Sequence, residues 1–327
     1  MTPSATPVSW INKKIQDMIS YDLEKYSEIP FTITDLAPNV AEVFDDFSSR
    51  KLLPSNGNYI IYKEKSLFSR EVDHILNRIG TTTPVNVYDL IDTNGEEVIP
   101  LIWSLADLNL LNSYVPVTQN PVINTNATDK LTLFCAANGI KDFRHESISA
   151  NLDLSSFNKQ TSIYTSFVED KTEVTNLFIL TNSTLGNFIH PERVLSNIYR
   201  SMDAGDYLVI LQGIFRPGTE DILTTDYRNI SPTLTTYMDI ARNIEPEAEV
   251  KTTWDDKNIN GVRMYFKLKR DLTYAGVDLK SDQEVTLFRS ARFNELTLRK
   301  HLLEIGFRIM NIAYDDDMDN ALFVLAK

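Results

Sequence analysis

The sequence has little of the chemistry that metal-dependent and disulfide-linked proteins use. It contains one cysteine, Cys135, in 327 residues. A single cysteine excludes an internal disulfide and a cysteine-rich zinc site. The four histidines, His74, His145, His190 and His301, are scattered and never pair at metal-ligand spacing. We therefore expect no metal site, and we expect Cys135, which lies in an apolar run, to be a small buried side chain.

The sequence also lacks long uncharged runs and an excess of basic residues. No run approaches the roughly 18 residues of a membrane span, and the opening MTPSATPVSW has no basic and apolar signal regions. We expect a cytoplasmic protein with no membrane partner. With 32 Lys and Arg against 45 Asp and Glu, the net charge is −13. Because phosphate binding needs a basic surface, nucleic acid is not an expected partner.

What the sequence does contain is the alternation of strand and helix patterns. The clearest unit comprises an apolar run at 177–180, the polar loop NSTLGNF at 182–188, a helical pattern at 191–202 and an apolar run at 207–211. This order predicts one βαβ unit. Such units build a doubly wound α/β sheet, in which ligands bind at the carboxyl ends of the strands.

Further elements are expected on both sides of this unit. The periodicity predicts helices at 11–26, 39–47, 69–79, 98–105 and 294–306, strands at 85–91, 114–117, 262–269, 284–293, 307–312 and 321–326, and a loop at 119–128. Ser69 is expected to cap the third helix, and Gly306 to end the last one.

We expect four parts along the chain. They are an N-terminal helical cap at 1–80, a Rossmann-like core at 81–215, an inserted substrate-binding subdomain at 216–283, and the C-terminal part of the core sheet at 284–327. The predicted fold class is thus α/β, with a doubly wound Rossmann-like sheet.

Six short motifs occur between residue 65 and the end of the chain. They are YVPV (114–117), NSTLGNF (182–188), DAGDYL (203–208), DYRN (226–229), VRMYF (262–266) and RSARF (289–293). In this order they resemble the histidine-specific, S-adenosylmethionine-dependent methyltransferases, whose best-known member trimethylates histidine for ergothioneine synthesis. Fungal N-methyltransferases of ergot-type alkaloid pathways are similar. A helix followed by an antiparallel strand pair, as expected at the C-terminus, is frequent in methyltransferase sheets.

The resemblance implies an amino-acid acceptor site at five positions. Asn187 and Tyr227 would hold the α-amino and carboxylate groups, because an amide carbonyl accepts from an amine and a phenol donates to a carboxylate. Met264 and Ser290 keep the thioether and hydroxyl of the family pattern. Phe288 stands where the family reads the imidazole with Glu, so we expect an acceptor side chain less polar than histidine.

The cofactor side departs from the family. The resemblance implies S-adenosylmethionine at a glycine-rich turn, which aligns with DLIDTNGEE (89–97). Only Gly95 is a glycine there, and Ile91 occupies a position where a β-branched residue is strained at positive φ. Thr118 replaces the Asp that accepts from both ribose hydroxyls, and Asp89 or Asp92 is a candidate to compensate.

The remaining cofactor positions are less tightly tied to the pattern. Asp142 and Phe143 correspond to the family's adenine-side Asp-Phe, and Asp170 is a rival for that role. Ser183, in the loop after the apolar run, is also placed on the cofactor side.

These residues lead to two hypotheses. The first is a divergent N-methyltransferase that acts on a small amine or amino acid. The alternative is a catalytically inactive protein of the same fold, which serves as a binding or scaffold subunit beside a partner enzyme or in a homo-oligomer. The loss of the glycines and of the ribose carboxylate favours the alternative, and the retained acceptor residues favour the enzyme.

Overall fold

A computed structural model of the chain describes residues 4–5, 13–31, 59–80, 82–90, 95–140, 144–158, 160–161, 174–230 and 235–327. The helix predicted at 39–47 lies outside these residues. The chain forms two compact units. Unit 1 comprises Met1–Asn58, Gly186–Ile189 and Pro217–Arg292, and unit 2 comprises Tyr59–Leu185, His190–Arg216 and Phe293–Lys327.

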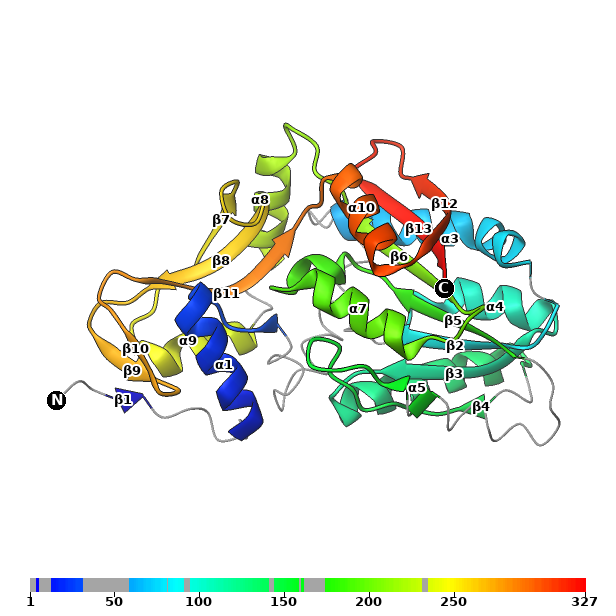
Figure 1. Cartoon of the computed structure of the whole chain (residues 1–327), viewed down its shortest axis with the longest axis horizontal. Helices are drawn as coiled ribbons and strands as arrows, with labels where there is room; N and C mark the ends of the chain where they lie inside the picture. Colours follow the sequence, from blue (N-terminus) through cyan, green and yellow to red (C-terminus); the bar gives the residue numbers. More distant parts are fainter. Residues whose placement is uncertain are drawn as a thin grey trace. The chain divides into compact units, whose positions relative to one another are not determined.

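Unit 2 is built around a seven-stranded sheet (Figure 1). From one edge to the other, its strands are β12 (Arg308–Tyr314), β13 (Asn320–Ala326), β6 (Tyr207–Gly213), β5 (Thr175–Leu180), β2 (Val85–Leu90), β3 (Leu111–Val117) and β4 (Arg144–His145). Neighbouring strands from β6 to β4 run parallel, whereas β13 is antiparallel to both β6 and β12. The chain proceeds outward in one direction from β2 and in the other from β5. This confirms the predicted doubly wound α/β fold.

The helices of unit 2 cover both faces of this sheet. On one face α3 (Tyr59–Ile79), α4 (Ile99–Asp107) and α5 (Pro121–Ala137) form one apolar core with the strands, including Val87 of β2 and Cys135 of α5. Cys135 is buried, as predicted. The alternate residue Tyr88 points to the opposite face, where its ring stacks on Phe178 and Phe178 meets Phe157. The Phe157 N–H donates to a hydroxyl of α7 (Pro191–Ser201), which contacts α10 (Glu295–Ile305).

Burial on two faces explains why these strands read as continuous apolar runs. All seven residues of β13 are buried, as are the last five of β5 and the last six of β6. An antiparallel sheet with one wet face would instead alternate apolar and polar residues. The two C-terminal strands and the helix before them are confirmed, and Gly306 ends α10 with a left-handed φ of 116°.

Two local predictions are wrong. The segment 119–128 is not a loop, because α5 begins at Pro121. The Asn120 side chain accepts from the Val122 N–H at 2.9 Å, and Pro121 stands in the first turn. The Asn and Pro residues that suggested a loop are therefore a helix start. Ser69 is not an N-cap, since it lies inside α3.

The described residues of unit 1 form two small sheets and three α-helices (Figure 1). One sheet comprises β1 (Ser4–Ala5), β9 (Leu272–Tyr274) and β10 (Val277–Leu279), and the other comprises β7 (Lys251–Asp255), β8 (Gly261–Lys267) and β11 (Glu284–Ala291). The helices are α1 (Lys13–Tyr26), α8 (Glu220–Ile230) and α9 (Thr235–Ile244). Helix α8 packs on β7 and β8, and α9 packs on β11.

The compact units divide the chain differently from the four expected parts. Helix α3 belongs to unit 2, although the predicted cap extended to residue 80. Strand β11 pairs with β8 and not with the seven-stranded sheet, although the predicted insertion ended at 283. An apolar strand pattern does not specify which sheet the strand joins, so this boundary was not readable from sequence. In the described portions of the chain, no helix is long and apolar enough to cross a membrane.

Candidate functional site

The carboxyl edge of the seven-stranded sheet in unit 2 gathers several predicted cofactor residues. Asp89 is the penultimate residue of β2, Thr118 directly follows β3, and Ser183 lies three residues after the end of β5. Strands β2 and β5 are neighbours, and the connections leave them in opposite directions. The switch point of the sheet lies here, and it is the usual ligand position in such folds.

Asp89 is engaged by the protein itself. The Tyr114 hydroxyl, from β3, donates to its carboxylate at 2.9 Å, and both residues are buried. Burial and the neighbouring carboxylate raise the pKa of the Tyr114 phenol well above its usual value, and Glu97 adds to this shift. The phenol therefore stays protonated and remains a donor to Asp89.

Gly95 is explained by the same tyrosine. Its φ is +79°, and a Cβ atom there would lie 2.8 Å from the Tyr114 hydroxyl. A side chain at this position would displace the phenol from Asp89. Gly95 is the one glycine retained in the aligned turn, and it leaves the space that the Tyr114 hydroxyl needs.

Thr118, which occupies the expected ribose position, is buried and bonded. Its hydroxyl accepts from the Asn120 N–H at 3.3 Å, and its carbonyl accepts from the Asn124 side chain at 3.3 Å. These bonds tie the end of β3 to the start of α5. Thr118 therefore serves the βα connection here.

Ser183 is held in a left-handed turn at the end of β5. Asn182 and Ser183 have φ values of 60° and 53°. The Ser183 hydroxyl accepts from the Gly213 N–H at 2.8 Å and donates to the Glu64 carboxylate of α3. Glu64 is buried and was not predicted as a site residue. It lies 119 positions from Ser183 in the sequence, within an ordinary helical pattern.

At this edge Thr118 stands where related sheets place the ribose carboxylate, directly after β3. A ribose diol is best held by a carboxylate that accepts from both hydroxyls. Thr118 offers a single hydroxyl, and the Asp89 carboxylate is bonded to Tyr114. The predicted positions Ile91, Asp142 and Phe143, like the rivals Asp92 and Asp170, lie outside the described residues.

The five predicted acceptor residues all belong to unit 1. The Tyr227 hydroxyl of α8 donates to the Ser290 hydroxyl of β11 at 2.6 Å. The Tyr227 and Phe288 rings lie 5.7 Å apart between centroids. Met264 of β8 is the register partner of Phe288 and is fully buried. The structure therefore brings together residues that are up to 63 positions apart in sequence.

A β-bulge sets which side chains of β11 share this face. The register with β8 shifts between Thr286 and Phe288, so that Leu287 is the extra residue. Side chains alternate across a strand, so one extra residue moves every later side chain to the other face. The bulge places Phe288 and Ser290 beside Met264.

Asn187 follows a very close approach of its backbone segment to β11. It ends the 3-10 turn η3 (Thr184–Asn187). A Cβ on the preceding Gly186 would lie 2.3 Å from the Ala291 carbonyl oxygen, so only glycine fits against β11 here. The next residue, Phe188, packs its ring on Phe31 at 5.5 Å between centroids.

Two aromatic residues beside this group escaped the sequence analysis. The Tyr237 ring of α9 lies 5.5 Å from Phe288, and the Phe31 ring lies 6.4 Å from it. Together with Phe188, Tyr227 and Phe288, they form what we call the aromatic cluster. Neither residue lies in one of the six motifs, and an isolated aromatic residue in a sequence is most often core.

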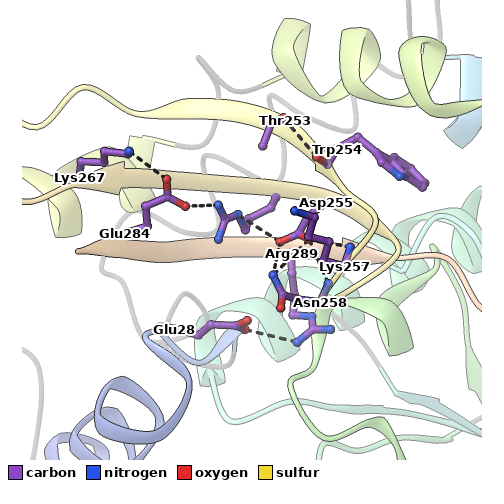
Figure 2. A network of polar contacts seen from close by, with 10 residues as sticks. Glu28, Thr253, Trp254, Asp255, Lys257, Asn258, Lys267, Glu284 and Arg289 are labelled. Atoms are coloured by element: carbon purple, nitrogen blue, oxygen red, sulfur yellow. Dashed lines mark hydrogen bonds and ion pairs between the residues drawn. The ribbon is translucent and has the colours of Figure 1, made fainter. Parts of the chain in front are cut away.

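The opposite face of β8 and β11 carries a network of ion pairs (Figure 2). Arg289 pairs with Glu28 at 3.4 Å, and Glu284 pairs with Lys267 at 3.3 Å. Burial raises the pKa of Glu28, and the Arg289 charge offsets this only in part. Arg263, the register partner of Arg289, pairs with Glu284 as well. The sheet formed by β8 and β11 thus has the aromatic cluster on one face and the ion pairs on the other.

No family model and no curated protein matches this sequence. Among solved structures, an S-adenosylmethionine-dependent methyltransferase from Clostridium acetobutylicum ATCC 824 is similar at 9% identity and a TM-score of 0.45, over 86% of this chain and 98% of that one. The 1,6-didemethyltoxoflavin-N1-methyltransferase of Burkholderia thailandensis, with bound 1,6-didemethyltoxoflavin and S-adenosylhomocysteine, is similar at 11% and 0.41, over 89% and 90%.

A structure described as a pericyclic reaction enzyme is similar at 12% identity and a TM-score of 0.41, over 77% of this chain and 46% of that one. The similar structures thus include enzymes of different reactions. Since the identities and TM-scores are low, we rest the fold assignment on the strand order, and we take no reaction from these likenesses.

Among the residues that the structure describes, no group of three or more His, Cys, Asp or Glu side chains is placed to hold an ion.

Proposed function

We propose that the chain is an S-adenosylmethionine-dependent N-methyltransferase for a small amine or amino acid whose side chain is less polar than that of histidine. The proposal places the chain near the histidine-specific methyltransferases as a divergent relative. The cofactor would supply the methyl group, at the carboxyl edge of the seven-stranded sheet.

One observation carries the proposal. Tyr227 and Ser290 share a hydrogen bond of 2.6 Å, and the Phe288 ring lies beside Tyr227. The resemblance assigned these residues to one acceptor site, although they come from separate motifs. Because a fold alone supports many activities, this convergence is stronger support than the strand order.

The proposed roles follow from the chemistry of each side chain. The Asn187 amide would accept from the α-amino group, and the Tyr227 hydroxyl would donate to the carboxylate of an amino acid. An apolar surrounding disfavours the ammonium form, so the aromatic cluster would favour the neutral amine that methylation needs. Positioning of the amine is the main task of such a site, since no covalent nucleophile is required.

The nature of Phe288 argues against histidine as the acceptor. The face of β11 that carries it holds Ser290 and, on β8, Met264. An imidazole N–H placed against the Phe288 ring would lack a carboxylate acceptor. A buried donor that is left unpaired costs about 1–3 kcal/mol. We therefore propose an acceptor with an apolar side chain.

The proposal is tested first by calorimetric titration of the full chain with S-adenosylmethionine. A dissociation constant in the micromolar range supports it, and the absence of heat at millimolar cofactor overturns it. Methyl transfer to a panel of free amino acids and amines is then measured by mass spectrometry. We expect Tyr227→Phe to lower kcat/KM about tenfold, because it removes one polar contact to the acceptor.

The matched control is Tyr265→Phe. Tyr265 lies on β8, and its ring stacks under the Arg263 guanidinium at 4.2 Å, on the charged face of the sheet. The Tyr265→Phe variant should leave kcat/KM unchanged. Equal losses in both variants would assign the effect to the stability of unit 1 and not to acceptor binding.

The alternative is a catalytically inactive protein of the same fold that serves as a binding or scaffold subunit. Asp89 and Thr118 are both bonded within the protein at the expected cofactor edge. A protein of this fold that binds the acceptor class but no cofactor would show the same arrangement. The calorimetric titration separates the two, because only the methyltransferase requires cofactor binding.

A further inference from the structure

The segment that precedes Phe31 is attached to the edge of β11 by backbone hydrogen bonds. The Ile29 N–H donates to the Thr286 carbonyl at 2.8 Å, and the Thr286 N–H donates to the Ser27 carbonyl at 2.8 Å. Glu28 and Thr286 form a parallel β-bridge. The segment therefore extends the sheet of β7, β8 and β11 by one short strand-like piece.

An ion pair fixes the register of this attachment. Glu28 and Arg289 meet at 3.4 Å, with side chains only 11% and 14% exposed (Figure 2). The charges facing Glu28 are Arg289, Arg263 and Asp255. Breaking a buried pair by removing one partner leaves an uncompensated charge. A slip of the segment by one residue would do the same, so the pair favours a single register.

Phe31 follows this attachment by two residues and lies within the aromatic cluster. Its ring is 6.4 Å from Phe288 and 5.5 Å from Phe188, the latter edge to face. Phe31 is 8% exposed. It is the member of the cluster that the N-terminal segment contributes, and its position depends on the register at Glu28.

We propose that Phe31 is a specificity-determining residue of the acceptor site, and that Glu28 and Arg289 are the positioning pair that holds it there. The proposal rests on the proposed function and names its acceptor class: an amine or amino acid with a planar aromatic side chain. Aromatic rings gain from edge-to-face and offset contacts with one another, beyond the burial of area. The Tyr227–Ser290 pair supplies the polar end of the same arrangement.

Measurements of amino-acid binding test the proposed specificity role of Phe31 without any cofactor. The dissociation constants of L-phenylalanine and L-histidine for the full chain are measured by calorimetry. These probes have similar size and differ in polarity. We expect the wild type to prefer L-phenylalanine about tenfold, Phe31→Ala to bring the ratio close to one, and Phe31→Leu to keep part of the preference. Tyr265→Ala, on the charged face, should leave the ratio unchanged.

A double-mutant cycle tests the positioning pair. Glu28→Ala should lower the preference partway, and the Glu28→Ala, Phe31→Ala double variant should have the same ratio as Phe31→Ala alone. Such non-additivity is expected if Glu28 acts through Phe31. Independent, additive effects on the ratio would remove the positioning role. Melting temperatures monitor whether the variants fold.

Each outcome decides one claim. If Phe31→Ala folds and keeps the wild-type ratio, or if the wild type binds neither amino acid, the specificity role of Phe31 is overturned. If the chain binds S-adenosylmethionine and methylates an amine while Phe31→Ala changes no preference, only this inference fails. If the preference depends on Phe31 but no cofactor binds, the methyltransferase proposal fails and the inference stands.

Discussion

At the scale of single residues, the hydrogen bond between Tyr114 and Asp89 decides the chemistry of the sheet's carboxyl edge. A carboxylate that is buried this deeply is stable only if donors surround it. Tyr114 provides one such donor, and Gly95 leaves the space for it. Asp89 is therefore one half of a buried phenol–carboxylate pair and not a bare carboxylate.

We predict that Tyr114→Phe destabilises the chain by about 1–3 kcal/mol, since it keeps the buried ring but removes a donor from a buried carboxylate. Urea denaturation followed by fluorescence measures this loss. The matched control is Tyr207→Phe, whose partly buried hydroxyl donates to the Ile79 carbonyl at 3.1 Å. That variant should lose no more than about 1 kcal/mol. Equal losses in the two variants would contradict the prediction.

At the scale of elements, two glycines allow separate segments to meet the end of β11. A Cβ on Gly186 would lie 2.3 Å from the Ala291 carbonyl oxygen, and one on Gly261 would lie 2.2 Å from the Ser290 carbonyl oxygen. Both contacts involve backbone atoms, which cannot rotate away. The position of Ser290 and of η3 beside it thus depends on the absence of two side chains.

We predict that Gly186→Ala destabilises the chain by about 3 kcal/mol, because backbone must move to admit the methyl group. The comparison is Gly218→Ala, where a Cβ would meet open space and only the left-handed φ of +93° opposes it. That cost is about 1–2 kcal/mol. Chemical denaturation of both variants measures the difference. A smaller loss for Gly186→Ala than for Gly218→Ala would show that the close approach is absent.

The same elements show what sequence patterns can and cannot predict. Continuous apolar runs identified β5 and β6 because both faces of the sheet are covered. The pattern of 119–128 was misread, since Asn and Pro favour both loops and helix starts. The bulge at Leu287 could not be predicted from the sequence, because a single extra residue is defined only by its pairing with the neighbouring strand.

At the scale of the whole molecule, the sequence predicted the acceptor residues of unit 1 and the cofactor residues of unit 2 to different extents. Tyr227, Phe288 and Ser290 were predicted from motifs as acceptor residues, and they do lie together. Phe31 and Glu64 were missed, because contacts between distant segments leave no local pattern. On the cofactor side, the sequence showed where the chain departs from the family pattern. It did not indicate that the Tyr114 hydroxyl would donate a hydrogen bond to Asp89.

The pH dependence of global stability offers a further test. Burial raises the pKa of Asp206 to about 6, although the Asp203 N–H and the Asn176 side chain donate to it. An unfolded Asp titrates near pH 3.9. The folded chain therefore holds this proton more tightly. The associated stability is fully present below about pH 4 and is lost as the pH rises to about 6, by up to about 3 kcal/mol.

We therefore predict that Asp206 makes the free energy of unfolding fall between pH 4 and pH 6, and that Asp206→Asn removes this contribution from the slope, because an amide does not titrate. Calorimetric unfolding at several pH values measures the slope, which a constant cost of the lost acceptor does not alter. Asp271→Asn is the control: its exposed carboxyl has a pKa lowered by the Ser281 N–H and by Lys280, so it titrates below this window. A wild-type slope retained in Asp206→Asn would show that Asp206 is ionised when the chain folds, and that the bonds from Asp203 and Asn176 outweigh its burial.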